Sequence, residues 1–324
     1  SITEQEALEA GDAWLEASIY QGKPDMHALR NMPTAKLSAE EQAFLDGPVV
    51  QVLSMIDDFA LQGENHIPKE ILDFISVNRF FALIIPKKFG GLEFSPYANS
   101  TIVATLAAKS AALAVTVMVP NSLGPGELLM HYGTHEQQNH YLPRLAVGTD
   151  IPCFALTSPE AGSDAGAIPD AGIVTKGMWE GKEVIGLRVS WDKRYITLAP
   201  IATVLGLAFK AFDVDGLLGD KVELGITCAL IPKSHPGVEL GNRHDPMGVK
   251  FYNGTTRGQD VFIPMDFVIG GQNNIGRGWQ MLVACLGAGR GISLPAMGVA
   301  SAQTALKSTA EYSFVREQFG VPIL

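Results

Sequence analysis

Cysteine, basic charge and long apolar runs are scarce in this 324-residue sequence, and each scarcity excludes a class of protein. The three cysteines, Cys153, Cys228 and Cys285, are odd in number and far apart, with no C-x-x-C pair. This pattern excludes a disulfide framework and a zinc knuckle. Lys and Arg number 24 against 34 Asp and Glu, giving a net charge of -10. Such an acidic balance argues against a nucleic-acid-binding surface.

Apolar runs free of charge are also missing. The most apolar stretch, residues 101–119, carries Lys109 at its middle, so it predicts a buried helix and not a membrane span. No secretory signal opens the sequence, and we expect a cytoplasmic protein. Because the sequence starts at Ser1 and ends at GVPIL without a closing element, we expect a piece of a longer protein. Membrane association through segments outside this piece stays open.

The first 150 residues contain mainly sequence signals for helices. Ser38 with Glu41 and Thr134 with Gln137 have the spacing of capping boxes. Pro48 predicts the restart of a helix. The expected apolar face of that helix comprises Val49, Val52, Leu53, Ile56 and Phe59.

The hydrophobic period changes near residue 150. Short β-prone runs follow Cys153, with a hairpin expected at Glu180-Gly181, and the helical period returns over 276–319. The pattern predicts an α+β fold in which a small all-β domain lies between two helical regions. The expected domains are a helical N-terminal domain (1–150), a β-domain (151–272) and a helical C-terminal segment (273–324).

The segment CFALTSPEAGSDAGAI, residues 153–168, is the most distinctive stretch of the sequence. Its Gly and Ala residues allow backbone amides to approach an anion, and its Ser residues add hydroxyl donors. A tight connection between strands explains the same composition. Local chemistry leaves both interpretations open.

Two histidines have the spacing of metal ligands on a helix. His131 and His135 are four residues apart, but Gly133 and Thr134 break the helix between them. We therefore interpret them as solvated or capping side chains, and no metal site is predicted.

Several motifs together resemble the acyl-CoA dehydrogenase family. The closest likeness is to its long bacterial branch, which serves fatty-acid β-oxidation. The segment HYGTHEQQNHYLPRLAVGTDIPCFALTSPEAGSDAGAI (131–168) resembles the family's Tyr-Gly-Thr signature followed by Ala-Gly-Ser-Asp. The other matching segments are IIPKKFGGLEFS (84–95), RYITLAP (194–200), DVFIPMDFVIG (260–270), GRGW (276–279) and REQFG (316–320).

The resemblance implies that the β-domain is barrel-like and that residues 273–324 form the first helices of a truncated C-terminal bundle. It further implies FAD-dependent α,β-dehydrogenation of a fatty acyl-CoA, the first step of β-oxidation. Electrons would pass to an electron-transferring flavoprotein, and the full-length protein would be a homo-oligomer. Two alternatives stay open. One is an acyl-CoA oxidase of the same fold, and the other is a non-catalytic protein that binds acyl-CoA or flavin.

The resemblance also assigns the first group of FAD-binding residues. It places Phe154, Leu156 and Thr157 along the flavin, with the Thr157 hydroxyl at its polar edge. Ser163 would meet the pyrophosphate and also contact the substrate. Without the flanking motifs, Thr157 would be read as an ordinary strand threonine.

Further FAD-binding residues follow from the later motifs. Tyr195 would pack on the isoalloxazine, and Thr197 would address N5 and O4. Arg316 and Phe319 would reach across a subunit interface to the neighbour's FAD. The alternatives are an ordinary strand threonine at 197, a solvated arginine at the end of a helix and a core phenylalanine.

Arg290 matches the family arginine that helps to bind the CoA thioester. Arginine suits this role because its planar fork grips phosphate and carbonyl acceptors. The surrounding glycines, Gly287, Gly289 and Gly291, superficially resemble a dinucleotide motif. Their last spacing is wrong and no strand precedes them, so a Rossmann site is not predicted.

The main departure from the family concerns the catalytic base. In the family a Glu lies beyond the Arg-x-x-Phe-Gly segment, and this sequence ends four residues after Gly320. We therefore assign no catalytic residue and expect this piece to be inactive alone. Glu160 lies where many relatives have Gly and is interpreted as solvated. Ser158 replaces a frequent Glu, and Tyr195 replaces a frequent Trp.

Overall fold

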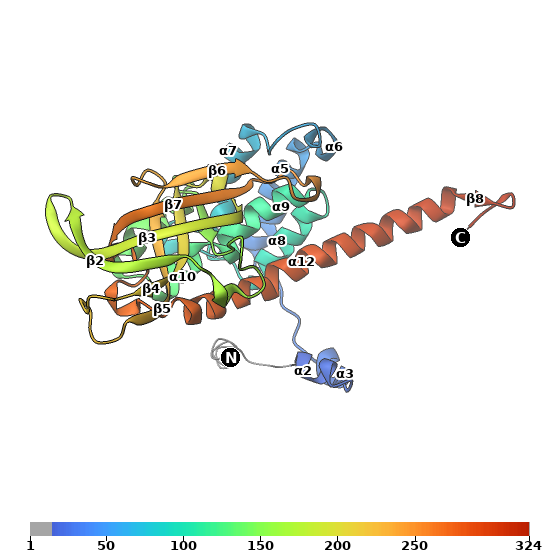
Figure 1. Ribbon diagram of the computed structural model, residues 1–324. Helices are drawn as coiled ribbons and strands as arrows, with labels where there is room; N and C mark the ends of the chain where they lie inside the picture. The colour runs from blue at the N-terminus through green and yellow to red at the C-terminus, as the bar shows by residue number, and fades with distance from the viewer. Residues whose placement is uncertain (1–14, 324) are drawn as a thin grey trace.

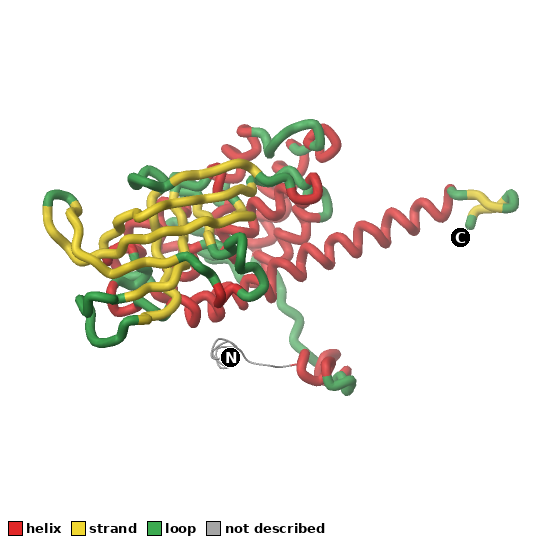
Figure 2. The backbone as a smooth tube through the Cα atoms, viewed as in Figure 1, coloured by secondary structure: helices red, strands yellow, loops and turns green. Residues whose placement is uncertain are grey.

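The computed structural model describes residues 15–323, apart from the side chains of Glu16, Leu123, Leu286, Ala288 and Arg290. A helical part precedes a curled mixed sheet, and a long helix follows it (Figures 1 and 2). The α-helices are α2 Leu15–Tyr20, α3 Met26–Arg30, α4 Ala39–Phe44, α5 Val50–Met55, α6 Asp58–Leu61, α7 Lys69–Val77, α8 Pro96–Ala107, α9 Ala111–Met118, α10 Pro125–Tyr132, α11 His135–Ala146 and α12 Gly278–Val315. The strands are β1 Pro152–Ala155, β2 Ala171–Trp179, β3 Lys182–Thr197, β4 Val204–Phe212, β5 Glu223–Pro232, β6 Glu239–Arg243, β7 Asn253–Pro264, β8 Glu317–Gln318 and β9 Val321–Pro322.

Two predicted helix starts are confirmed by their hydrogen bonds. The Ser38 hydroxyl accepts from the Glu41 amide, and the Glu41 carboxylate accepts from the Ser38 amide. Thr134 and Gln137 make the same reciprocal pair at the start of α11. Each pair satisfies amides that a helix start leaves without a partner.

The helix predicted after Pro48 is confirmed as α5, and Val49, Val52 and Ile56 of its predicted apolar face are buried, but the predicted new start at Pro48 is wrong. Pro48 lies inside η1 (Leu45–Val49), a π-helical turn that joins α4 to α5, so the chain stays helical from Ala39 to Met55. Proline has no amide donor and disrupts regular α-helical hydrogen bonding, and the chain takes the wider π-turn at this point. Phe59 is 90% exposed and does not belong to the buried face.

The single helix predicted over residues 101–119 is also wrong. The structure divides this stretch into α8 and α9, and the Ser110 hydroxyl accepts from the Leu113 amide at the start of α9. Lys109 lies at the break, where its ammonium donates to the Leu53 carbonyl at 2.6 Å. No helix in residues 15–323 is long and apolar enough to cross a membrane.

Seven strands of the described chain form one mixed sheet in the order β1-β4-β2-β3-β7-β6, and β5 also pairs with β4. β4 runs parallel to β1 and β2, and the other pairs are antiparallel. The predicted hairpin is confirmed, because Glu180 and Gly181 both have positive φ between β2 and β3. This curled sheet between helices confirms the predicted α+β class, whereas the three domain boundaries stay predictions.

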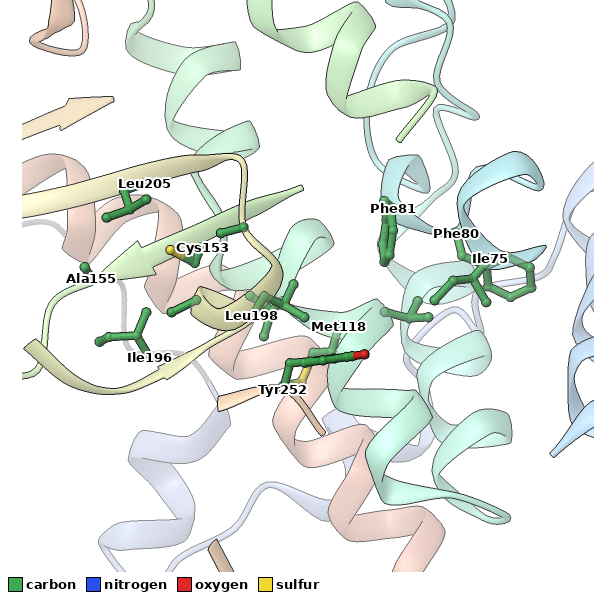
Figure 3. Packing of buried hydrophobic residues seen from close by; sticks show 14 of the residues in the cluster. Ile75, Phe80, Phe81, Met118, Cys153, Ala155, Ile196, Leu198, Leu205 and Tyr252 are labelled. Carbon is green, nitrogen blue, oxygen red and sulfur yellow. The ribbon is translucent and has the colours of Figure 1, made fainter. Parts of the chain in front are cut away.

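The main core is continuous between the helical part and the sheet (Figure 3). Phe80 and Met118 from the helical part belong to the same buried cluster as Ile196 and Leu205 from the sheet. The hydroxyl of Tyr252 donates to the Ile67 carbonyl at 3.4 Å. The far end of α12 and the β8–β9 hairpin project away from this body (Figure 1).

Candidate functional site

The carboxyl end of β1 opens the candidate site. The chain leaves the sheet at Leu156 and returns at β2, and the loop between them is 156–170. Phe154 and Leu156 are half-buried and pack against the second hydrophobic cluster. A Cβ atom at Gly206 of β4 would lie 2.5 Å from Cδ2 of Phe154, so glycine at that position leaves room for the ring.

The start of the loop is anchored to β3. The Arg194 amide donates to the Thr157 carbonyl at 3.1 Å, and the Arg194 guanidinium donates to the Pro159 carbonyl at 2.9 Å. The amides of Ser158 and Ala161 each donate to the other's carbonyl, which closes a tight turn. The backbone of this segment is therefore held in one conformation.

Two hydroxyl groups of the loop are available for a ligand. Within the described chain, neither the Thr157 hydroxyl nor the Ser163 hydroxyl makes a hydrogen bond to another protein group, and Ser163 is exposed. Hydroxyl groups beside an anchored backbone can donate to an anion or to a polar ring. The structure thus places Thr157 and Ser163 on one loop, and their predicted contacts with FAD stay predictions.

Tyr195 and Thr197 lie at the end of β3. Tyr195 is 53% exposed and has φ 57°, a left-handed conformation that is rare for a bulky residue. Its ring lies 4.5 Å, between centroids, from the ring of His244. The Thr197 hydroxyl accepts a 3.4 Å hydrogen bond from Asn253, so this hydroxyl has a protein partner that the sequence did not indicate.

The neighbours of Tyr195 and Thr197 each carry a buried polar atom without a hydrogen-bond partner in the described chain. Nε2 of His244 and Oδ1 of Asn253 are both buried and make no hydrogen bond within the described residues. Buried polar atoms are normally paired, so each of these two atoms calls for a partner such as water or a bound group. Sequence reasoning missed both residues, because neither belongs to a motif.

Sequence reasoning also missed a buried ion pair behind the loop. Lys193 and Asp170 are 0% and 1% exposed, and Nζ lies 2.5 Å from Oδ2. Burial lowers the pKa of Lys193 from its ordinary value, and the Asp170 carboxylate opposes this shift. One sequence signal could have indicated that Lys193 is buried. Side chains alternate along a strand, and Lys193 falls on the same inward side of β3 as Val189 and Trp191.

The remaining predicted residues do not join this group. Arg290 lies in α12, but its side chain is outside the described residues. Arg316 follows the last residue of α12, and Phe319 is fully exposed in the β8–β9 hairpin, which projects away from the body of the chain (Figure 1). Their predicted role at a neighbour's site is not tested by a single chain.

Glu160 is exposed, as its interpretation as a solvated side chain expects. No cluster of three or more His, Cys, Asp or Glu that could hold a metal occurs among residues 15–323.

Comparison with known sequences identifies two family domains. Residues 38–149 match the family "Acyl-CoA dehydrogenase, N-terminal domain", and residues 153–261 match "Acyl-CoA dehydrogenase, middle domain". The protein HemX of Proteus mirabilis is 54% identical over 108 residues, which cover 32% of this chain and 64% of HemX. The probable acyl-CoA dehydrogenase FadE10 of Mycobacterium tuberculosis is 29% identical over 296 residues, which cover 90% of this chain and 43% of FadE10. The chain thus spans less than two thirds of either relative.

Solved structures share the fold. Butyryl-CoA dehydrogenase from Megasphaera elsdenii has a TM-score of 0.74 at 23% identity, covering 90% of this chain and 73% of that protein. An acyl-CoA dehydrogenase complexed with FAD from Bacillus anthracis has a TM-score of 0.67 at 23% identity, covering 88% and 44% respectively. At these identities the likeness establishes the architecture alone.

Proposed function

Because the chain belongs to the acyl-CoA dehydrogenase family, we propose that it forms the FAD-binding part of an enzyme that dehydrogenates a fatty acyl-CoA between Cα and Cβ. One observation carries this proposal. The loop after β1 is anchored to β3 while the hydroxyls of Thr157 and Ser163 have no partner in the described chain. An anchored loop with free donors suits a ligand that has both a polar ring and phosphates.

The residues at the site fit FAD. Phe154 and Leu156 would offer apolar contact. Thr157 would offer a hydroxyl to the polar edge of the flavin, and Ser163 would offer one to the pyrophosphate. The orphan atoms of His244 and Asn253 would gain partners from a bound group with donors and acceptors. A relative of the same fold has been solved with FAD.

The role of these residues in the reaction is electrostatic and positional. When bound, FAD supplies the acceptor for the hydride that leaves Cβ while a base removes the proton from Cα. Thr157 and Thr197 would donate hydrogen bonds to the flavin edge, where negative charge would develop. Ser163 and Arg290 would orient the thioester. An electron-transferring flavoprotein is the proposed acceptor of the electrons.

FAD titration of this chain tests the proposal. We expect weak, saturable binding, measured by fluorescence polarisation of FAD. Thr157→Val removes one donor at nearly constant volume and should raise the Kd about fivefold, which corresponds to one hydrogen bond.

The matched control is Thr175→Val in β2, which changes the same side chain away from the loop. It should leave the Kd unchanged. Absence of saturable binding by the wild-type chain would remove FAD from the proposal, and an unchanged Kd for Thr157→Val would remove Thr157 from the site.

A further inference from the structure

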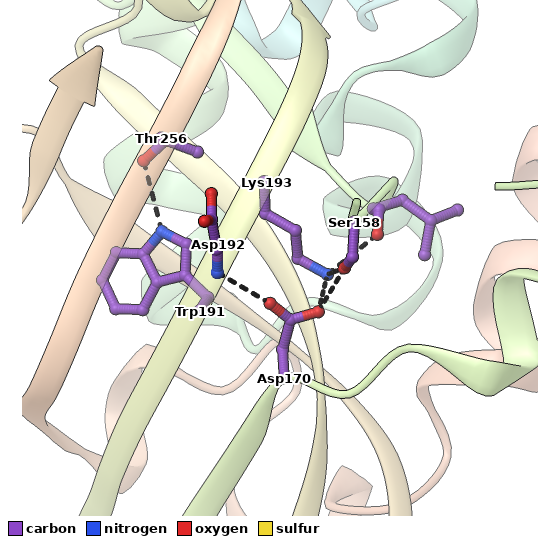
Figure 4. Close-up of polar contacts among 7 residues, drawn as sticks. Ser158, Asp170, Trp191, Asp192, Lys193 and Thr256 are labelled. Carbon is purple, nitrogen blue, oxygen red and sulfur yellow. Dashed lines mark hydrogen bonds and ion pairs between the residues drawn. The ribbon is translucent and has the colours of Figure 1, made fainter. Parts of the chain in front are cut away.

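A closed hydrogen-bond network lies behind the loop that follows β1 (Figure 4). Its centre is the Lys193 ammonium, which donates to the Asp170 carboxylate at 2.5 Å, to the Leu156 carbonyl at 2.8 Å and to the Ser158 hydroxyl at 3.1 Å. Asp170 also accepts from the Ser158 hydroxyl at 2.5 Å and, through its other oxygen, from the Asp192 amide at 3.0 Å. All three donors of the ammonium are therefore used.

The network contacts the residues on both sides of Thr157. Lys193 holds the carbonyl of Leu156 and the hydroxyl of Ser158, while the neighbouring Arg194 amide holds the carbonyl of Thr157 itself. Three consecutive loop residues are thus tied to two consecutive residues of β3. The backbone of residues 156–158 is held by these hydrogen bonds, whereas the Thr157 hydroxyl has no partner in the described chain.

A buried ion pair is a costly way to stabilise a fold. Lys193 and Asp170 are 0% and 1% exposed, so both charges have lost their hydration. Replacing such a pair by apolar groups of similar volume is often neutral or stabilising. Stability alone therefore does not account for the pair, whereas fixing one backbone geometry does, because an apolar side chain cannot hold a carbonyl and a hydroxyl in place.

We propose that Lys193 is a positioning residue: its ammonium group, held by Asp170, fixes the backbone of residues 156–158 so that the Thr157 hydroxyl meets the bound ligand in a single orientation. The ligand in this statement is FAD, and that part rests on the proposed function. The fixation of the loop does not depend on it.

Single and double variants of the ion pair distinguish a role in positioning the loop from a role in stabilising the fold. Lys193→Met and Asp170→Asn each leave one buried partner without its counter-charge, so both should lower the Tm strongly. Lys193→Met/Asp170→Asn removes both charges at similar volume. Its Tm should return to within about 5 °C of the wild-type value.

Two readouts follow the loop itself. Hydrogen exchange of the amides of residues 156–164 reports its mobility, and FAD titration reports its function. In Lys193→Met/Asp170→Asn we expect about tenfold faster exchange in this segment and an about tenfold higher Kd, despite the restored Tm. A purely structural pair would give wild-type values in both.

A second, partly exposed ion pair supplies a control for charge removal outside the network. Arg144 and Asp150 lie before β1 and are joined at 2.6 Å, away from the loop. Arg144→Met/Asp150→Asn should leave exchange in residues 156–164 and the Kd unchanged. If it changes them as much as the other double variant does, the effect is general and the proposal is wrong.

Two outcomes would overturn the proposal directly. One is wild-type exchange and binding in Lys193→Met/Asp170→Asn. If that variant does not fold, Ser158→Ala decides, because it keeps both charges and removes one contact. It should speed exchange at residues 156–158 about threefold, and an unchanged rate would contradict the proposal. Failure of the wild-type chain to bind FAD contradicts the proposed function alone, since hydrogen exchange still tests Lys193.

Discussion

At the residue scale, Glu127 is a titratable group that belongs to no motif. It lies in the first turn of α10 and is half-buried, and no hydrogen bond to its carboxylate occurs in the described chain. Burial raises the pKa of Glu127 from 4.5 to about 7. The unfolded chain should keep the lower value, so the folded state binds one more proton between these two pH values.

This proton uptake predicts a pH-dependent stability. The free energy of unfolding should fall as the pH rises from about 4.5 to about 7, because the unfolded state then releases a proton that the folded state retains. Glu127→Gln cannot ionise and should remove this slope. Above pH 7 it should stabilise the protein by about 1–2 kcal/mol, a value reduced for partial solvent exposure. Urea unfolding across this pH range measures the difference.

The control for this prediction is Glu70→Gln. Glu70 also lies in the first turn of a helix, α7, but it is exposed. Its replacement should leave the pH dependence of the wild-type protein in place. Equal slopes for the wild-type protein and Glu127→Gln would mean that Glu127 ionises with an ordinary pKa.

At the scale of the element, α12 approaches η4 (Val119–Leu123) closely. A Cβ atom at Gly289 would lie 2.0 Å from the Ser122 carbonyl oxygen, which is a backbone atom and cannot move aside cheaply. One helical turn later, the hydroxyls of Ser293 and Ser122 are hydrogen-bonded. Gly289 is therefore required by contact between two elements and not by helix geometry.

Gly289→Ala should therefore destabilise the protein. Overpacking should lower the free energy of unfolding by about 1–3 kcal/mol, and the higher helix propensity of alanine offsets about 1 kcal/mol of this loss. Gly287→Ala in the same helix is the matched comparison, because nothing lies within 4 Å of its added Cβ. That substitution should be neutral or stabilising. Denaturant midpoints of the two variants test this, and equal midpoints would show that α12 does not pack this closely.

At the scale of the whole molecule, the helical part and the sheet share one core. Met118 of α9 lies in the same buried cluster as Leu198 and Leu205 of the sheet region (Figure 3). Val117 of α9 belongs to this cluster as well. Separating the two parts would expose both surfaces to water, at a cost of about 25 cal/mol for each Å² of apolar area.

A shared core predicts cooperative unfolding. Differential scanning calorimetry should give one main transition, with a calorimetric enthalpy close to the van't Hoff enthalpy. A chain ended at residue 150 should fail to fold stably, because its share of the cluster loses the sheet. Two separated transitions, or a stable fragment 1–150, would show that the predicted domains fold independently.

Local signals in the sequence were sufficient for many elements. Ser38 and Thr134 cap helices through partners three residues away, and the hairpin at Glu180 needs only residues that tolerate positive φ. Interactions of this range are readable because the partner is in the same short stretch. The Pro48 restart was wrong because α4 and α5 remain joined through a π-turn that no short-range pattern indicates.

The sequence by itself determined the family, the α+β class and the loop that carries Thr157 and Ser163, since each depends on short motifs or on hydrophobic period. Tertiary structure alone decided which polar groups are paired. Lys193 meets Asp170 across 23 positions of the chain, and Asn253 meets Thr197 across 56. Such pairing depends on which strands lie side by side and which side chains point inward. The sequence therefore shows that Lys193 is charged. Only the folded chain shows that Lys193 is buried, that it pairs with Asp170 and that it binds residues 156 and 158.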